Sequence, residues 1–248
     1  MSTLLILLGA ALGVAQTPSL RIASDATFPP FHFLAEPGGP TGFEIELARL
    51  VAERQGFRPE VLVLPYDDLL PGLARGAHHL VAATTGITPE REKLYLFTRP
   101  YFETCQAALV RVGENEPKTL AELSGRRVGA AGEGTSARAL AHLQGVEAVP
   151  LGKGEAGVPF LEQGRIDALI VDEYGAVRTA RASNGRLRVL PEPVALERYA
   201  FVLSLGACDL KVSLDSALES LEREGLLDEL RKKFGVDRDA DWPVKIER

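Results

Sequence analysis

Cysteine is scarce in this sequence, with two residues among 248, and methionine and tryptophan occur once each. Two cysteines allow at most one intrachain disulfide. The composition, 46% hydrophobic and 25% charged, is typical of a folded soluble protein and excludes collagen-like, coiled-coil and disordered chains. The net charge of −6 argues against a surface for nucleic acid or anionic membranes. The length predicts about one or two domains.

Long hydrophobic runs are also absent, except at the N-terminus. Residues 3–15 form an uncharged apolar run that is shorter than the ~20 residues needed to span a bilayer. Gly13 and Ala15 are small and are followed by the polar Gln16, which is typical of a signal-peptidase site. We therefore predict a signal peptide over residues 1–15 and an exported mature protein, located in the periplasm or outside the cell. A buried N-terminal strand or helix is the alternative.

The sequence contains none of several enzyme signatures. It has no Gly-x-Ser-x-Gly elbow, no His-Glu-x-x-His or Cys-x-x-Cys motif, and no Gly-Lys-Ser/Thr phosphate loop. Gly129, Gly132 and Gly134 lack the spacing of a dinucleotide fingerprint. His78 and His79 are adjacent, and neighbouring strand residues point to opposite faces, so the pair cannot easily chelate one ion. We therefore predict no cofactor and no metal site.

The sequence does contain a regular alternation of strand and helix patterns. In a first series, strands at 20–23, 60–64 and 79–83 alternate with helices at 43–54 and 68–75, the second of which Asp67 can cap. In a second series, strands at 126–130, 147–150, 166–171 and 187–190 alternate with helices near 135–143, 156–163 and 173–182. Two helices, at 211–223 and 226–234, end the chain. This spacing predicts an α/β protein with parallel sheets covered by helices.

Two extended runs, at 104–111 and 198–205, connect the two series. We therefore predict two lobes joined by two crossings, with a discontinuous first lobe over 17–108 and 205–248 and a second lobe over 109–204. The crossings should run side by side, which would bring Cys105 close to Cys208. In an exported protein these residues could form a disulfide; the alternative is two unrelated thiols.

Polar residues follow two strands that belong to a weak internal repeat. Residues 73–85 and 161–173 each contain a helix end, a glycine, an apolar strand and then polar residues, Thr84-Thr85 in one and Asp172-Glu173 in the other. Ligands of open α/β sheets bind beyond the carboxyl ends of the strands. These residues are therefore predicted to face a binding site from opposite lobes, with only one of the two acidic side chains pointing inward.

Two further features could belong to such a site. Thr135 and Ser136 begin a helix after a glycine-rich turn, where backbone N–H groups can bind an anion, although the glycines could equally form an ordinary turn. Phe28 and Phe31 follow the end of a strand beside two prolines that stiffen the loop. Aromatic residues in this place belong either to the core or to the wall of a ligand site.

Several motifs resemble one protein family over residues 20–235. The clearest is Gly42-Phe-Glu-Ile-Glu-Leu-Ala, and others are Asp25-Ala-Thr-Phe-Pro-Pro-Phe, Ile87-Thr-Pro-Glu-Arg and Asp167-Ala-Leu-Ile-Val-Asp. With these motifs the chain resembles the extracellular solute-binding proteins of family 3, the polar amino-acid receptors of ATP-binding-cassette importers. The resemblance implies a type II periplasmic-binding-protein fold, with a ligand cleft between two α/β lobes.

The resemblance also implies how the two ends of an amino acid are held. Arg91 matches the arginine that clamps the α-carboxylate, and its planar guanidinium offers two parallel N–H donors. Asp172 matches the carboxylate that receives the α-ammonium, and Thr135 matches a donor from the second lobe. Gly86 stands where many members carry a hydroxyl residue, so that a threonine of the same loop would have to supply this contact: Thr84, Thr85 or Thr88.

Three more residues match positions that contact the ligand side chain. Phe28 and Tyr66 occupy the places of the aromatic residues that sandwich it, and Asp25 occupies the place of a residue that binds a polar or cationic end. These residues favour a polar or cationic amino acid, but they do not decide which one.

The sequence thus predicts an exported, monomeric protein that binds a free amino acid and delivers it to the membrane permease of an importer, with no bond made or broken. The alternative is a cyclohexadienyl-dehydratase-like enzyme on the same fold. The resemblance implies that such an enzyme carries a glutamate three residues after Asp172, where this chain has Gly175. A sensor module of a receptor is a second alternative.

Overall fold

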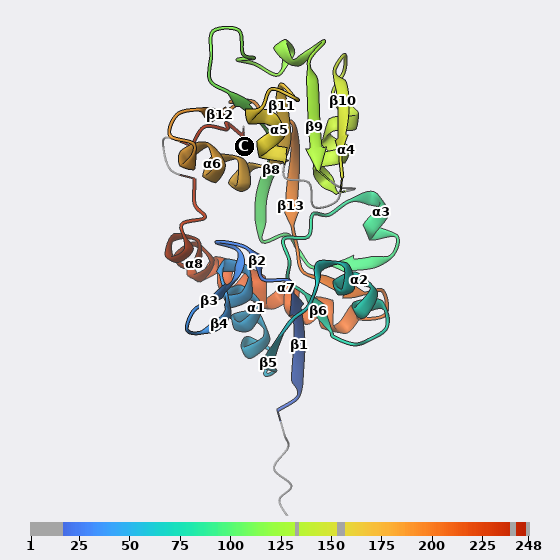
Figure 1. The fold of residues 1–248 in the computed structure, drawn as a ribbon. Coiled ribbons are helices and arrows are strands. Elements are labelled where there is room, and N and C mark those ends of the chain that lie inside the picture. The colour runs from blue at the N-terminus through green and yellow to red at the C-terminus, as the bar shows by residue number, and fades with distance from the viewer. Residues whose placement is uncertain (1–16, 132–133, 153–156, 239–241, 247–248) are drawn as a thin grey trace, which may run out of the picture.

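The computed structural model describes residues 17–131, 134–152, 157–238 and 242–246. The predicted signal peptide lies outside these residues. The described chain forms two α/β lobes, one above the other in Figure 1, each with a sheet covered by helices. In these ranges no helix combines the length and the apolar character needed to cross a membrane.

The first lobe contains a five-stranded sheet in the order β5-β1-β6-β14-β7. Its strands are β1 (Ser19–Ser24), β5 (Arg58–Val63), β6 (Leu80–Val81), β7 (Tyr95–Phe97) and β14 (Val202–Ser204). Its helices are α1 (Phe43–Arg54), α2 (Tyr66–Ala74), α3 (Pro89–Glu92), α7 (Cys208–Arg223) and α8 (Leu226–Phe234). A small antiparallel sheet that the sequence patterns did not indicate precedes α1 and consists of β2 (Thr27–Phe28), β3 (His32–Ala35) and β4 (Gly39–Thr41).

The second lobe contains a sheet in the order β10-β9-β11-β8-β12, with β13 also paired to β8. Its strands are β8 (Phe102–Arg111), β9 (Arg127–Ala131), β10 (Glu147–Leu151), β11 (Ala168–Asp172), β12 (Leu187–Val189) and β13 (Ala195–Tyr199). Its helices are α4 (Thr135–His142), α5 (Gly157–Glu162), α6 (Glu173–Ala182) and a short 3₁₀ helix, η1 (Ala121–Leu123).

The prediction of parallel sheets is only partly right. The strands that alternate with helices are parallel, β1 to β5 and β6 in one lobe and β9 to β10 and β11 in the other. The strands next to the crossings are antiparallel to their neighbours: β14 pairs with β6 and β7, and β8 pairs with β11, β12 and β13. Both sheets are therefore mixed, because the chain enters and leaves the second lobe in opposite directions.

The two crossings lie side by side, as predicted. Thr98 N donates to Phe201 O at 3.0 Å, and Tyr101 N donates to Tyr199 O at 3.1 Å. The paired strands place the change of sheet at 98–101 and 200–201, so the first crossing comes earlier in the chain than the run at 104–111. The predicted lobe limits, 108–109 and 204–205, remain a prediction.

The predicted disulfide between Cys105 and Cys208 is wrong. Cys105 is fully buried within β8, Cys208 is exposed at the first residue of α7, and both thiols are free. The early first crossing explains this difference. It places Cys105 inside the sheet of the second lobe, whereas Cys208 belongs to the first lobe.

Helix α1 shows how the local sequence produces the first lobe. Phe43, Leu47 and Val51 recur at helical spacing and are fully buried, and α1 has the limits predicted from that spacing. Gly42 precedes it at φ 125°, and a Cβ there would lie 2.3 Å from Phe31 O, so this close approach requires glycine.

Helix α2 begins earlier than predicted, at Tyr66. Its N-cap residue is Pro65, whereas Asp67 lies inside the first turn. The predicted cap at Asp67 is therefore wrong. An acidic residue within the first turn still interacts favourably with the helix dipole, which explains why the pattern looked like a helix start.

Candidate functional site

The first-lobe half of the site is the loop between β6 and α3. The Thr88 hydroxyl caps α3 by accepting a hydrogen bond from Arg91 N at 3.3 Å, and Pro89 follows at the first helical position. The cap places the Arg91 guanidinium over the loop, where Nη1 donates to Gly86 O at 2.8 Å. This bond uses one of the five N–H donors of the guanidinium. The loop thus presents a positioned cation.

The same loop contains a strained residue, Thr84. Its φ of 44° is rare for a β-branched side chain. Thr84 N donates to Glu44 Oε2 at 2.7 Å, and the Tyr101 hydroxyl donates to the other oxygen of Glu44. Glu44 is fully buried, and this burial raises its pKa to about 8. Strain of this kind persists where the surroundings hold it in place, and we infer that Glu44 positions the loop.

His32 connects this loop to Asp25. Its Nε2 lies 3.2 Å from Thr84 Oγ1, and its Nδ1 lies 3.3 Å from Asp25 Oδ1. Burial lowers the pKa of His32 to about 4, so that the imidazole is neutral at pH 7. The Asp25 carboxylate therefore stands beside a neutral ring. The Thr27 hydroxyl donates to the other carboxylate oxygen of Asp25.

The two predicted aromatic residues lie in different environments. Phe28 is half-buried and stacks on Phe31, with ring centroids 5.5 Å apart. It reaches the second lobe, because a Cβ at Gly175 would lie 3.9 Å from Phe28 Cε2. Tyr66 is 53% exposed at the start of α2. Its part in the site remains a prediction.

Asp172 forms the centre of the second-lobe half. It is the N-cap residue of α6, and its Oδ1 accepts hydrogen bonds from Tyr174 N at 2.9 Å and Gly175 N at 3.2 Å. The Tyr199 hydroxyl donates to Oδ2. Burial raises the pKa of Asp172 to about 7, although these donors oppose the shift. A cationic partner would favour the charged form.

Glu173 faces away from Asp172. Its carboxylate is fully buried and receives hydrogen bonds from Thr104 Oγ1 at 3.0 Å, from Arg238 and from the Trp242 indole. The two carboxylates therefore have different partners: Asp172 caps α6, and Glu173 contacts the C-terminal segment.

A polar network completes the second-lobe half. Gln106 Nε2 donates to Glu197 Oε2 at 2.7 Å and lies 3.2 Å from Thr135 Oγ1, and the Ser136 hydroxyl donates to Gln106 Oε1 at 2.7 Å. Glu197 is 9% exposed. Thr135 and Ser136, predicted from the glycine-rich turn, thus stand beside a buried carboxyl group that the prediction did not include.

The backbone and two side-chain contacts bring the two halves together. Gly86 forms a β-bridge to Tyr199, and Ala200 N donates to Thr85 O at 3.4 Å. Farther out, Arg178 Nη1 donates to Pro29 O at 3.2 Å. Arg138 of α4 forms an ion pair with Glu90 of α3. The structure therefore places the loop with Arg91 next to the strand that ends at Tyr199.

Sequence reasoning missed Glu197, Gln106, Tyr199 and the positioning role of Glu44. Gln106 lies in the buried run 104–110 of β8, in which Thr104 is the other residue with a polar side-chain oxygen or nitrogen. Glu197 and Tyr199 alternate with exposed residues along β13, so they share a face of the strand. These signals were present in the sequence, but no element next to them showed that this face meets the loop with Arg91.

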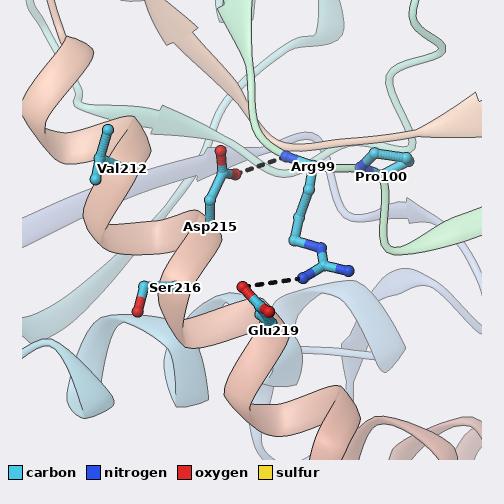
Figure 2. Close-up of a pocket in the computed structure, with 6 residues that line it drawn as sticks. All are labelled: Arg99, Pro100, Val212, Asp215, Ser216 and Glu219. Carbon is cyan, nitrogen blue, oxygen red and sulfur yellow. Dashed lines mark hydrogen bonds and ion pairs between the residues drawn. The ribbon is translucent and has the colours of Figure 1, made fainter.

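A pocket of about 620 Å³ lies elsewhere, against α7 in the first lobe (Figure 2). Three of its charged residues contact one another: Arg99 N donates to Asp215 Oδ1 at 2.6 Å, and the Arg99 guanidinium lies 3.7 Å from Glu219. It contains none of the predicted site residues. In the part of the chain that the structure describes, no three His, Cys, Asp or Glu side chains gather as a metal site would require.

Comparison with known proteins gives one consistent result. Residues 20–237 match the model of the bacterial extracellular solute-binding proteins, family 3. The L-cystine-binding protein TcyJ of Escherichia coli strain K12 is 31% identical over 228 residues, which cover 90% of this chain and 85% of that protein.

Two solved structures are similar as well. An ancestral arginine-binding protein bound to glutamine has a TM-score of 0.74 and 31% identity, covering 88% of this chain and 98% of that one. The ancestral amino acid-binding protein AncCDT-1, a precursor of cyclohexadienyl dehydratase, has a TM-score of 0.74 and 26% identity, covering 87% and 95%. The predicted type II periplasmic-binding-protein fold is confirmed.

Proposed function

The chain belongs to family 3 of the bacterial extracellular solute-binding proteins, and on this basis we propose that it binds a free amino acid between its lobes and delivers it to the permease of an ATP-binding-cassette importer. The proposal includes export by the N-terminal segment to the periplasm or the outside of the cell, and a monomeric state.

The observation that carries the proposal is the opposite charge of the two halves of the site. The loop after β6 supplies Arg91, and the N-terminus of α6 supplies Asp172. A zwitterion has one carboxylate and one ammonium, so it needs one fixed cation and one fixed anion. Because these come from different lobes, binding would join the lobes by hinge closure.

The chemistry of each group supports its role. Arg91 can bind a carboxylate in a bidentate manner. Asp172 accepts hydrogen bonds from Tyr174 N, Gly175 N and the Tyr199 hydroxyl, but burial still raises its pKa to about 7. An α-ammonium would favour its ionised form. Asp25, beside the neutral His32, favours a ligand whose side chain is polar or cationic.

The dehydratase alternative has less support. The position where the resemblance implies a catalytic glutamate is Gly175, whose backbone N–H instead binds Asp172. The relative TcyJ is named as an L-cystine-binding protein, and AncCDT-1 is described as an amino acid-binding protein and a precursor of the dehydratase. Binding without catalysis is therefore the function that we propose.

A thermal-shift screen of the twenty amino acids and L-cystine tests this function. A ligand present at 100 times its Kd adds about 2.7 kcal/mol of apparent stability, so at least one amino acid should raise the melting temperature clearly. Prephenate and arogenate serve as the comparison for the enzyme. Turnover of either compound, or no shift with any amino acid, would contradict the proposal.

A further inference from the structure

The Glu197 carboxyl group lies against Gly86, in the loop that also carries Arg91, the residue proposed to bind the ligand carboxylate. A Cβ added at Gly86 would lie 2.0 Å from Glu197 Oε1 and 2.9 Å from its Cδ. Glu197 therefore fills the space that the missing side chain at Gly86 leaves open. Since the Arg91 guanidinium is bonded to the carbonyl of the same glycine, the two groups share one corner of the cleft.

The second lobe holds Glu197 in this place. Gln106 Nε2 donates to its Oε2 at 2.7 Å, and Thr135 contributes a further hydrogen bond. The titratable groups that face it are Arg91 from the first lobe, Asp172 from the end of β11, and Tyr199 from β13 itself. Burial raises the pKa of Glu197, whereas Arg91 and the hydrogen bonds lower it.

Two carboxylates beside one guanidinium in a buried site cannot both be ionised easily, because their charges repel. A protonated carboxyl group, in contrast, can donate a hydrogen bond to a carboxylate. Asp172 has the opposite requirement, because it must be ionised to pair with an ammonium. With ligand bound, one of the two carboxyl groups beside Arg91 would thus need a proton, and Glu197 would carry it.

Building on the proposed function, we propose that Glu197 is a specificity-determining residue that binds the ligand carboxylate in its protonated form, together with Arg91. Binding then leaves Asp172 ionised against the ligand ammonium and keeps a proton on Glu197 against the ligand carboxylate. This arrangement matches a zwitterion at both ends. A ligand whose carboxylate is blocked cannot use it.

The variant Glu197→Gln tests the proposal, because a glutamine amide is a permanent neutral donor. The probes are the amino acid with the largest shift in the thermal screen and its α-carboxamide, measured by titration calorimetry at pH 6, 7 and 8. We expect the variant to bind the amino acid at least about tenfold more tightly than the parent at pH 8. This ratio should grow from pH 6 to pH 8, because only the parent must keep a proton at position 197.

The matched control is Glu147→Gln, which removes the same charge from an exposed position on β10, and it should leave the affinity unchanged. The carboxamide should show no gain with Glu197→Gln. Equal or weaker binding of the amino acid by Glu197→Gln at pH 8, or a ratio that does not change with pH, would overturn the proposal. An equal gain for the carboxamide would overturn it too.

A measurement without ligand separates this proposal from the proposed function. The ¹³C resonance of the Glu197 carboxyl, assigned by its loss in Glu197→Gln, should titrate above the pKa of about 4.3 of an unperturbed glutamate, because burial raises its pKa. A midpoint in the ordinary range contradicts the role of Glu197 even if amino acids bind. A raised midpoint with no amino acid bound would contradict the proposed function and leave the neutral cleft carboxyl in place.

Discussion

Among the described residues, each lobe has one completely buried glutamate, and the two are held in different ways. In the first lobe, Glu44 is bonded to neutral donors, the Tyr101 hydroxyl and Thr84 N. In the second lobe, Glu173 forms an ion pair with Arg238 at 2.7 Å. A buried charge is costly unless it is paired. Glu44 therefore has a pKa raised to about 8, whereas Glu173 has a cation beside it.

The two networks also differ in what they connect. The Glu44 network stays within the first lobe and positions the loop that carries Arg91. The Glu173 network ties the C-terminal segment to the second lobe, since Trp242 also donates to Glu173 and Lys245 N donates to Pro191 O at 2.9 Å. Because this segment follows α8 of the first lobe, the second network fastens one lobe to the other (Figure 1).

The largest effect that we expect concerns Glu173. Glu173→Ala leaves the half-buried Arg238 without its carboxylate and should destabilise the protein by about 3–5 kcal/mol, as for other broken buried pairs. Urea unfolding followed by circular dichroism measures this loss. Glu147→Ala, on the exposed edge of β10, should change the stability by less than about 0.5 kcal/mol. If Glu173→Ala lowered the free energy of unfolding by less than about 1 kcal/mol, the ion pair with Arg238 would not distinguish Glu173 from Glu44 in the way described.

The next effect separates the two halves of the site. Arg91→Ala and Asp172→Ala should each weaken binding by about 2–5 kcal/mol, or roughly 30-fold to several thousand-fold in Kd, while the fold remains intact. Arg91→Ala should weaken the binding of ligands that have a free carboxylate. Asp172→Ala should weaken the binding of ligands that have a free α-ammonium. Titration calorimetry with the amino acid and with its analogue lacking the ammonium decides this.

Glu147→Ala is the control for these two variants, because Glu173 is buried and its loss would disturb the fold. If a ligand without an ammonium lost as much affinity in Asp172→Ala as the complete amino acid, the assignment of Asp172 would be wrong.

A smaller effect sharpens the contrast between the buried glutamates. The pKa of Glu44 is raised from 4.5 to about 8, so that the folded protein keeps a proton which the unfolded chain loses between these values. Stability should therefore fall as pH rises from 4.5 to 8, by at most about 1.4 kcal/mol per pH unit from this group. Glu44→Gln should flatten the pH dependence in this window.

Urea unfolding of the parent and of Glu44→Gln at several pH values measures this difference. Glutamine can still accept the hydrogen bond from Thr84 N, so the variant should fold. Parallel pH profiles for the two proteins would show that Glu44 is ionised in the folded state and that its hydrogen bonds suffice to hold the charge.

The smallest effect concerns the place where the lobes meet at the surface. Arg138 and Glu90 form an exposed pair across the cleft, and exposed pairs contribute little. Arg138→Ala should weaken amino-acid binding by less than about fivefold, and 0.5 M NaCl should remove most of the difference. An effect as large as that of Arg91→Ala would mean that lobe closure, and not the ligand contacts, dominates the affinity.

Much of the fold could be predicted from local patterns. The helices at 43–54, 173–182 and 226–234 have the predicted limits, because apolar residues recur at helical spacing and Gly56, Asp172 and Gly225 mark their ends. The small sheet of residues 27–41 was missed, because strands of two to four residues are too short to show alternation. The predicted disulfide was wrong because the position of a crossing depends on which strands pair. Strand pairing involves residues far apart in the sequence.

The candidate site likewise has features that local patterns predict and features that depend on tertiary packing. Local patterns were enough to predict most of the α/β elements, the motif that carries Arg91 and the acidic pair at the end of β11, because hydrophobic spacing, caps and charged residues at strand ends are local features. The packing of the chain sets the rest: Asp172 accepts from Tyr199 while Glu173 binds Arg238, Glu44 accepts from Thr84 N, and Glu197 fills the space beside Gly86. These contacts join residues 27 to 111 positions apart, and which of them form depends on how the two lobes pack together, which no local pattern records.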